Sequence, residues 1–157
     1  MKKQGVMVLL KKGTKILLLI RKKENEQTHQ QGIYLPLGGH VEKGESIIDA
    51  AIREINEEAN VNIKSLHLRA ILYSRSLAAD HYDDWVNFLF ISDEFMGEAR
   101  DGNEGKVKWI EIDEISKLNM YEGIKIFLTE VLKTKFLVME THHNNHELLE
   151  YKILVSY

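Results

Sequence analysis

The chain has 157 residues, of which 44% are hydrophobic and 29% charged, and this balance predicts a single globular domain over residues 1–157. A formal net charge of −3 without a basic run argues against nucleic acid as a partner. The lack of cysteine excludes disulfides and thiol catalysis. No apolar run has the length of a membrane span or the layout of a signal peptide, so we expect a cytoplasmic protein without a membrane partner.

The first predicted elements are two short apolar runs, residues 6–10 and 16–20, joined by a turn that contains glycine. Such runs are typical of buried strands, and the turn between them predicts a hairpin. The polar residues 22–31 are predicted to form a loop, and residues 33–37 another strand. Two glycines follow that strand. Because glycine lets a backbone turn tightly or approach a ligand, we expect the strand to enter an active site.

The next predicted element is a helix within residues 39–61 that gathers several carboxylates. Glu57 and Glu58 lie three and four positions beyond Glu54, so the three carboxylates share one side of the helix. Like charges this close repel unless a cation lies among them, which favours a metal site. The alternative is an ordinary amphipathic surface helix. The apolar residues predicted to attach it to a core are Ile48, Ala51, Ile52, Ile55 and Ala59.

The later segments complete an α/β pattern. Strands are predicted at residues 66–75, 84–91 and 107–110, and the first two are separated by a polar connection that contains residues 81–83. The helical segments are a short turn at residues 112–118 and a full helix at residues 123–133. The tail predicts a closing hairpin of residues 135–140 and 147–155. The two helices would then cover both sides of a mixed sheet.

Residues 39–61 fit the pattern G-x5-E-x7-R-E-U-x-E-E-x-G-U, where U is apolar, with Asn60 in place of the second-last glycine. The segment closely resembles the signature of the MutT-like Nudix hydrolases. That glycine would follow the helix end with positive φ, and asparagine is the next most tolerant residue there. The order of elements resembles the whole Nudix α/β/α sandwich, a mixed sheet between helices with a C-terminal β-hairpin. The tail, KFLVMETHHNNHELLEYKILVSY, is similar to that of the oxidised-purine nucleoside triphosphatase branch.

This resemblance implies a Mg²⁺ site, in which Mn²⁺ would substitute. Its ligands would be Glu54, Glu57, Glu58 and the carbonyl oxygen of Gly38. A cation held by carboxylates neutralises phosphoryl oxygens and lowers the pKa of a bound water, and phosphoanhydride hydrolysis needs both. By the same resemblance, Glu54 or Glu57 would orient or deprotonate the attacking water.

Three further residues are expected to complete the catalytic centre. Glu45 would position Arg53, whose planar fork would hold a glutamate of the signature, and we expect both to support the site structurally. Glu104, five residues before Trp109, matches a place outside the signature where this family often has a further ligand or base. The alternative for Glu104 is a solvated loop glutamate.

Substrate contacts are predicted at two places. Arg21 follows a strand and would contact phosphate oxygens, or else lie exposed on a loop. At the start of the last helix, Tyr121 would stack on a base, and Glu122 would accept a hydrogen bond from it or cap the helix. Leu35 stands where the oxidised-purine branch has an asparagine, and it offers packing without hydrogen bonds.

Other chemically notable residues are interpreted as structural. His142, His143 and His146 lie in a predicted hairpin turn without fixed ligand geometry, so they are expected to be solvated rather than to bind a transition metal. His40 follows the glycines at a position that varies in the family. Trp85 is expected in the sheet or core.

The function implied is Mg²⁺-dependent cleavage of a nucleoside diphosphate linked to another moiety. The substrate class expected first is a nucleoside triphosphate, ordinary or oxidised, cleaved to monophosphate and pyrophosphate, which is the chemistry of nucleotide pool sanitation. The alternatives are hydrolysis of another diphosphate such as a nucleotide sugar, and a sensor that binds nucleotide without turnover. The partner is a small-molecule nucleotide, and the oligomeric state stays open.

Overall fold

The computed structural model describes residues 2–22, 32–78 and 81–157. The predicted loop at residues 22–31 therefore falls, apart from Lys22, outside the described residues. The first strands and helix are β1 (Lys3–Lys12), β2 (Lys15–Arg21), β3 (Ile33–Leu35), β4 (Leu37–His40) and α1 (Ile47–Ala59). They are followed by β5 (Asn62–Ile63), β6 (His67–Ala78), β7 (His81–Ser92), β8 (Phe95–Met96) and β9 (Lys106–Glu111). The chain ends with the 3-10 helix η2 (Ile112–Lys117), α2 (Glu122–Val131), β10 (Leu137–Asn144) and β11 (Glu147–Ser156).

Most strands belong to one mixed sheet with the order β11-β10-β6-β7-β1-β2-β3. In addition, β4 pairs with β1, β9 pairs with β2, and β5 and β8 form a separate small sheet. The central strand β1 runs parallel to β7 and antiparallel to β2 and β4. The tail is an antiparallel hairpin in which β10 runs parallel to β6. These pairings confirm the predicted mixed sheet and the C-terminal hairpin.

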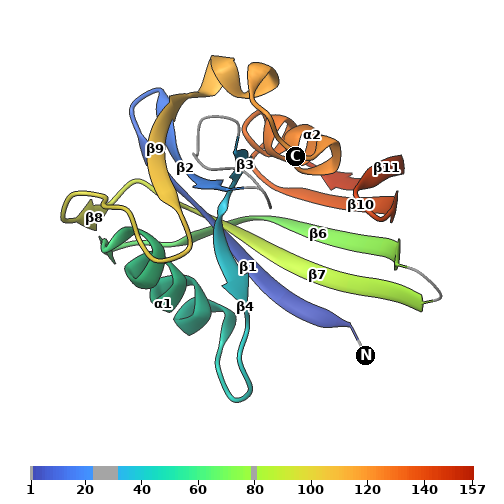
Figure 1. Cartoon of the computed structure of the whole chain (residues 1–157), viewed down its shortest axis with the longest axis horizontal. Coiled ribbons are helices and arrows are strands. Elements are labelled where there is room, and N and C mark those ends of the chain that lie inside the picture. Colours follow the sequence, from blue (N-terminus) through green and yellow to red (C-terminus); the bar gives the residue numbers. More distant parts are fainter. Residues whose placement is uncertain (1, 23–31, 79–80) are drawn as a thin grey trace.

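The two helices lie on opposite sides of this sheet (Figure 1). Strand residues alternate between the two sides, so neighbours in β1 belong to different cores. Leu9 packs in the core that includes Phe127 and Leu128 of α2, whereas Val8 and Leu10 pack in the core beneath α1. All five of these side chains are fully buried. The α/β/α layering follows from this alternation.

Two sequence predictions need correction. Ile48 and Ile52 do not face the core but are 42% and 44% exposed, because α1 approaches the sheet through Ala51, Ile55 and Ala59. Residues 81–83 of the predicted connection are part of β7, which pairs with β6 from Ala78↔His81 to His67↔Ile91 with one irregularity between Leu68 and Ala70. Polar side chains occupy this end of the strand since it extends beyond the two cores. Backbone pairing therefore continues where apolar alternation has stopped.

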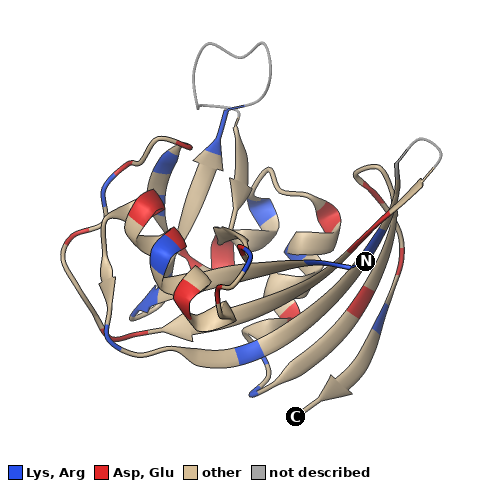
Figure 2. Ribbon diagram, turned by 90° about the horizontal axis from the view of Figure 1, so that it is seen from below, with Lys and Arg blue, Asp and Glu red and all other residues tan. Residues whose placement is uncertain are grey.

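The surface charges and the character of the helices both bear on the sequence predictions. From the side of α1, basic and acidic residues are interspersed rather than gathered into one basic face (Figure 2). None of the helices in the described ranges combines the length and the apolar character needed to cross a membrane.

Candidate active site

The glycines of β4 let its backbone lie against both β1 and α1. Gly38 has φ of 147°, and a Cβ atom there would collide with the Val6 carbonyl oxygen. At Gly39, a Cβ would lie 2.6 Å from the carboxyl carbon of Glu54. Since such contacts are shorter than real Cβ atoms allow, any larger residue would displace the Glu54 carboxylate. The paired glycines therefore bring an acid of α1 onto the backbone of β4.

Helix α1 is capped at its start by Ser46 and at its end by Asn60. The Ser46 hydroxyl accepts a hydrogen bond from the Asp49 N–H at 3.0 Å. At the other end, Asn60 has the left-handed φ of 55° and donates its N–H to the Asn56 carbonyl. This is the conformation expected for the residue that replaces the glycine of the signature. The caps fix where the helix begins and ends, and with it the direction of its acidic side chains.

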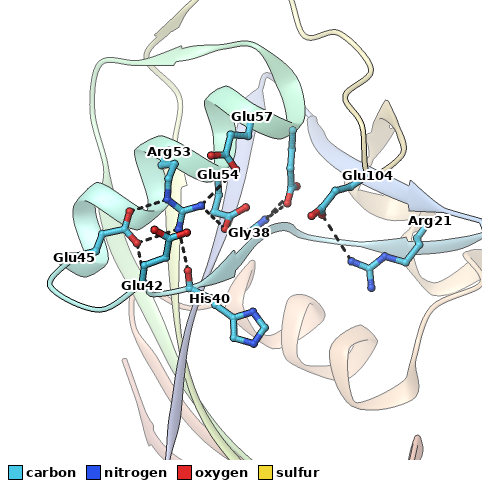
Figure 3. A network of polar contacts seen from close by, with 10 residues as sticks. Arg21, Gly38, His40, Glu42, Glu45, Arg53, Glu54, Glu57 and Glu104 are labelled. Atoms are coloured by element: carbon cyan, nitrogen blue, oxygen red, sulfur yellow. Dashed lines mark hydrogen bonds and ion pairs between the residues drawn. The ribbon is translucent and has the colours of Figure 1, made fainter.

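Arg53 is the centre of a polar network beside β4 (Figure 3). Its guanidinium donates two hydrogen bonds to Glu45, at 2.8 and 3.0 Å, in a bidentate pair. It also donates to Glu54 at 2.8 Å, to Glu57 at 3.4 Å and to the His40 carbonyl at 3.0 Å. Arg53 thus links Glu45, Glu54 and Glu57 to the end of β4, which is compatible with the supporting role predicted for Arg53 and Glu45.

The ion pair between Glu45 and Arg53 stabilises the charged form of both side chains. The hydrogen bond from Arg53 is the main reason that the pKa of Glu45 falls to about 2, and the N–H of Glu42 contributes as well. In return, the hydrogen bond to Glu45 is the largest cause that raises the pKa of Arg53. Glu45 therefore stays ionised and compensated by one specific partner.

Glu58 lies on the inner side of the helix and is 2% exposed. Its carboxylate accepts the Gly38 N–H, at 3.3 and 3.4 Å to the two oxygens. Burial is the main cause that raises the pKa of Glu58 to about 8, and the negative charges of Glu104 and Glu54 raise it further. The Gly38 N–H and Arg21 act in the opposite direction without offsetting this. Glu58 is a buried acid with too little positive charge nearby.

A cleft of about 570 Å³ opens beside these residues. It brings together most residues that the sequence assigned to the site: Arg21, Leu35, Gly38, Arg53, Glu54, Glu57 and Glu104. Glu45 lies behind Arg53, and Glu58 lies beneath the surface of the cleft. The structure thus places these two next to the cleft without making them part of its wall.

Arg21 and Glu104 face each other across the mouth of the cleft. Their charged groups are 4.0 Å apart, and each side chain is 58% exposed. An ion pair this long and exposed contributes little to stability, so both side chains can exchange one another for a ligand. Their predicted roles in phosphate and metal binding are compatible with this position.

A second hollow, of about 240 Å³, adjoins the cleft. Trp85, Asn87 and Ile124 line both spaces, so the two lie side by side and share these three residues as walls. Tyr121 lines only the second hollow, where its ring stacks on His146 with centroids 4.6 Å apart. Glu122 is exposed in the first turn of α2 and lines neither space. Its contact with a base stays a prediction.

The three tail histidines have different surroundings. His142 contacts Glu140 at 2.6 Å and Glu150 at 3.4 Å on the sheet. His143 lines the second hollow and packs against α2, where burial is the main cause that lowers its pKa. His146 is exposed beside Tyr121. In the described ranges, no group of three or more His, Cys, Asp or Glu side chains has a ready metal-binding geometry.

Two residues of β7 belong to the site although the sequence did not assign them to it. Asn87 reaches toward Gly5 of β1, its partner in the sheet, and its amide lies between the two hollows. Trp85 contacts the His40 ring edge-on, at 4.6 Å between centroids, and donates its indole N–H to Asp83. A lone amide within the apolar run WVNFLFI was the available signal for Asn87. Nothing in the sequence distinguishes Trp85 from a core tryptophan.

The chemistry of the donors fits a hard divalent cation. Mg²⁺ binds carboxylate and carbonyl oxygens, and the buried, under-compensated Glu58 lies beside Glu54 and near Glu104. A cation among these groups would favour the ionised form of Glu58. At present Arg53 occupies one oxygen of Glu54, so that oxygen would exchange the guanidinium for a ligand. The predicted ligand role of the Gly38 carbonyl stays a prediction.

Known proteins resemble the chain over most of its length. A family model described as the NUDIX domain matches residues 1–131. The chain is 30% identical to the uncharacterized Nudix hydrolase YvcI of Bacillus subtilis, over 92% of this chain and 90% of that protein. The oxidized purine nucleoside triphosphate hydrolase of Danio rerio is 27% identical over 74% of each chain. The crystal structure of a mutator MutT protein from Bacillus halodurans matches with a TM-score of 0.85, at 27% identity and 97% coverage of both chains.

Sequence match, fold and site geometry point the same way. The match covers the signature and its helix, the fold agrees over nearly the whole chain, and Glu54 and Glu57 of the signature line one cleft with Arg53. The chain therefore belongs to the Nudix family of hydrolases, which act on phosphoanhydride bonds.

Proposed function

We propose that the protein is a divalent-metal-dependent pyrophosphohydrolase that converts a nucleoside triphosphate to the monophosphate and pyrophosphate. The observation that carries this proposal is that the acidic cleft and the hollow lined by Tyr121 lie side by side, with Trp85, Asn87 and Ile124 lining both. The cleft is lined by carboxylates, whose oxygens Mg²⁺ prefers, and the neighbouring hollow has the aromatic ring of Tyr121. A nucleoside triphosphate has the same division into a charged chain and a flat base. Its role would be to remove oxidised nucleotides from the cytoplasmic pool.

The acidic end would hold the metal. Glu54, Glu57, Glu58, Glu104 and the Gly38 carbonyl are the proposed oxygen ligands, and Mg²⁺ or Mn²⁺ the proposed ion. When bound, such an ion neutralises charge on the phosphoryl oxygens and lowers the pKa of a coordinated water. Arg21 would add a positive charge at the mouth of the cleft, where a phosphate chain has to enter.

The proposed proton acceptor is Glu57 or Glu54. The Glu57 side chain is 59% exposed, and among the described residues its only polar contact is the one of 3.4 Å with Arg53, so its carboxylate can approach a water. Glu54 is held more tightly, at 2.8 Å from Arg53. This difference favours Glu57 as the mobile base and Glu54 as the fixed ligand. Arg53 and Glu45 would keep Glu54 oriented without touching the substrate.

The hollow beside Tyr121 suits a nucleobase but does not identify which base is bound. Tyr121 can stack on a planar ring, and stacking tolerates any base. Leu35 offers packing where the oxidised-purine branch has an asparagine, whereas Asn87 of β7 brings an amide to the same cleft. The likeness to the oxidized purine nucleoside triphosphate hydrolase of Danio rerio favours an oxidised purine as the first candidate.

The test is hydrolysis of a substrate panel with Mg²⁺, with products separated by chromatography. The panel contains ordinary and oxidised nucleoside triphosphates, ADP-ribose, nucleotide sugars and dinucleoside polyphosphates. We expect a triphosphate to give the highest kcat/KM and to release pyrophosphate. Preference for an oxidised purine would support the sanitising role, whereas preference for another diphosphate would contradict the triphosphate proposal and retain the Nudix chemistry.

The matched pair Glu57→Gln and Glu114→Gln tests the site itself. Both changes remove one negative charge from an exposed glutamate, but Glu114 lies on η2 and does not line the cleft. We expect Glu57→Gln to abolish most turnover and Glu114→Gln to leave it unchanged. Wild-type turnover by Glu57→Gln would remove Glu57 from the mechanism. Nucleotide binding without turnover by the wild-type protein would instead indicate a sensor.

A further inference from the structure

Strand β11 leaves one edge of the sheet unpaired among the described residues. It is ten residues long, it ends the strand order, and its only neighbour in that order is β10 (Figure 1). An edge strand presents free N–H and C=O groups that can pair with another chain. Proline commonly prevents this, but the single proline of the sequence is Pro36, far from β11.

The same strand concentrates exposed apolar surface. Ten large hydrophobic side chains are exposed in the described ranges, and half of them lie on β11 or at the residue that follows it. They are Leu149 (62% exposed), Tyr151 (46%), Ile153 (45%), Leu154 (49%) and Tyr157 (75%). Scattered apolar residues need no explanation, but a contiguous group beside an open edge is typical of an interface.

The charges on β11 select a second copy of the strand as its partner. When two identical strands pair antiparallel about a two-fold axis, one residue lies opposite itself. With Tyr151 at that position, Glu150 lies opposite Lys152 of the partner subunit, and the symmetric contact repeats it. An axis at Glu150 or Lys152 would instead place like charges opposite one another, which is destabilising. We propose that β11 pairs antiparallel with β11 of a second copy of this chain, about an axis at Tyr151.

The proposed contact lies in the part of β11 that pairs regularly with β10. The pairing of β10 with β11 is irregular at two places, where Leu149 and Leu154 are the extra residues on β11. Between them, residues 150–153 pair without interruption and contain both charges of the proposed contact. Within the described ranges, the one ion pair of Glu150 is with His142, at 3.4 Å, and its side chain is 56% exposed, so it can reach across the edge.

The extent of the contact predicts its strength. Irregularities in an edge strand bend it away from a partner and shorten the pairing. The interface is therefore smaller than the roughly 1,600 Å² of a standard stable complex, and the dimer depends on protein concentration. None of the residues that line the active-site cleft belongs to β11, so the dimer does not depend on the proposed activity.

The first test is sedimentation velocity over a concentration series, with the wild type and three variants. Lys152→Glu converts two attractive contacts into two repulsive ones, so we expect the dissociation constant to rise about tenfold or more. The charge swap Glu150→Lys/Lys152→Glu restores both contacts and should restore dimerisation. Lys11→Glu makes the same charge change at an exposed residue near the end of β1 and should have no effect.

Single cysteines test the register, since the natural chain has no cysteine. Residues directly opposite in antiparallel strands have Cα atoms about 4.5–5.5 Å apart, within disulfide range. We therefore expect Tyr151→Cys to cross-link to itself under mild oxidation, far faster than Tyr82→Cys, whose side chain is 62% exposed on β7. Glu150→Cys mixed with Lys152→Cys should give the mixed disulfide.

Two outcomes would overturn the proposal. One is a wild-type protein that stays monomeric at every concentration, which leaves the edge open to a different partner. The other is a dimer that survives Lys152→Glu while Tyr151→Cys cross-links no faster than Tyr82→Cys, which assigns the dimer to another surface. Circular dichroism of each variant shows that the fold is kept, so neither outcome can be attributed to unfolding.

Discussion

Glu45 lies just before α1 and Glu58 lies near its end. The surroundings of these two identical side chains shift their pKa values in opposite directions. Glu45 has a bidentate partner in Arg53, and its pKa falls to about 2. Glu58 is buried against the Gly38 N–H, and its pKa rises to about 8. One carboxylate is fully compensated within the chain, whereas the other is not.

The difference separates structural from functional acids within one motif. A compensated carboxylate holds its neighbours in place and gains nothing from a ligand. An uncompensated buried carboxylate costs free energy in its ionised form, and a bound cation removes that cost. The signature therefore contains both a support and a binding group, which the residue type alone does not distinguish.

The largest expected effect is the loss of activity in Glu58→Gln. Glutamine keeps an acceptor for the Gly38 N–H and nearly the same volume, but it removes the negative charge that would bind the metal. We expect kcat/KM at fixed Mg²⁺ to fall about 100-fold, with a lower affinity for the metal. Steady-state kinetics with a Mg²⁺ titration measures both. Activity equal to wild type would show that Glu58 is only a buried structural acid.

The second effect is on the pH dependence of stability without metal. Because the folded-state pKa of Glu58 is raised from 4.5 to about 8, its contribution to stability is fully present below pH 4.5 and is lost as pH rises to about 8. Thermal unfolding in a chelator should therefore show the wild type losing stability relative to Glu58→Gln across this window. Added Mg²⁺ should remove the decline. Parallel melting curves for the two proteins would contradict the raised pKa.

Glu104→Gln should have an intermediate effect, because this acid contributes to the negative potential at Glu58 from an exposed loop. We expect turnover to fall at least about tenfold with the melting temperature unchanged, since a ligand outside the helix adds affinity but no packing. The matched control is Glu111→Gln, a strand glutamate paired with Lys15 away from the cleft. An unchanged rate in Glu104→Gln would assign Glu104 to the solvated loop.

Much of this comparison could be predicted from the sequence. The spacing of Glu54, Glu57 and Glu58 predicted one acidic side of a helix, and the glycines predicted a close approach of backbone and ligand. Asn60 was predicted to adopt positive φ, and it does. These features are local, because helix geometry and φ preferences act within a few residues.

The remainder depends on contacts between segments distant in the sequence. Glu58 is buried because α1 lies close to β4. Helix periodicity places Glu57 and Glu58 on the same side of the helix, so it cannot predict that Glu58 is buried while Glu57 is exposed. The place of Asn87 in the cleft depends on the parallel pairing of β7 with β1, more than eighty residues earlier in the chain. The exposure of Ile52 was also missed, because the apolar pattern did not reveal that small alanines make the close contact.

The smallest effect is expected for Glu45→Gln, which completes the comparison. The amide keeps one acceptor for Arg53 but loses the charge, so Arg53 and through it Glu54 become less firmly oriented. We expect kcat to fall by roughly three- to tenfold, with little change in metal affinity, because Glu45 does not touch the cleft.

The pH dependence of stability under acidic conditions distinguishes Glu45→Gln from Glu58→Gln. Since the pKa of Glu45 is lowered from 4.5 to about 2, its stabilising contribution is present above pH 4.5 and is lost as pH falls toward 2. Glu45→Gln should therefore weaken the dependence of unfolding on pH in the acid window, where Glu58→Gln leaves it intact. If both variants changed the same pH window, or both lost metal binding equally, the two acids would belong to one site, and the division of the motif into support and ligand would be wrong.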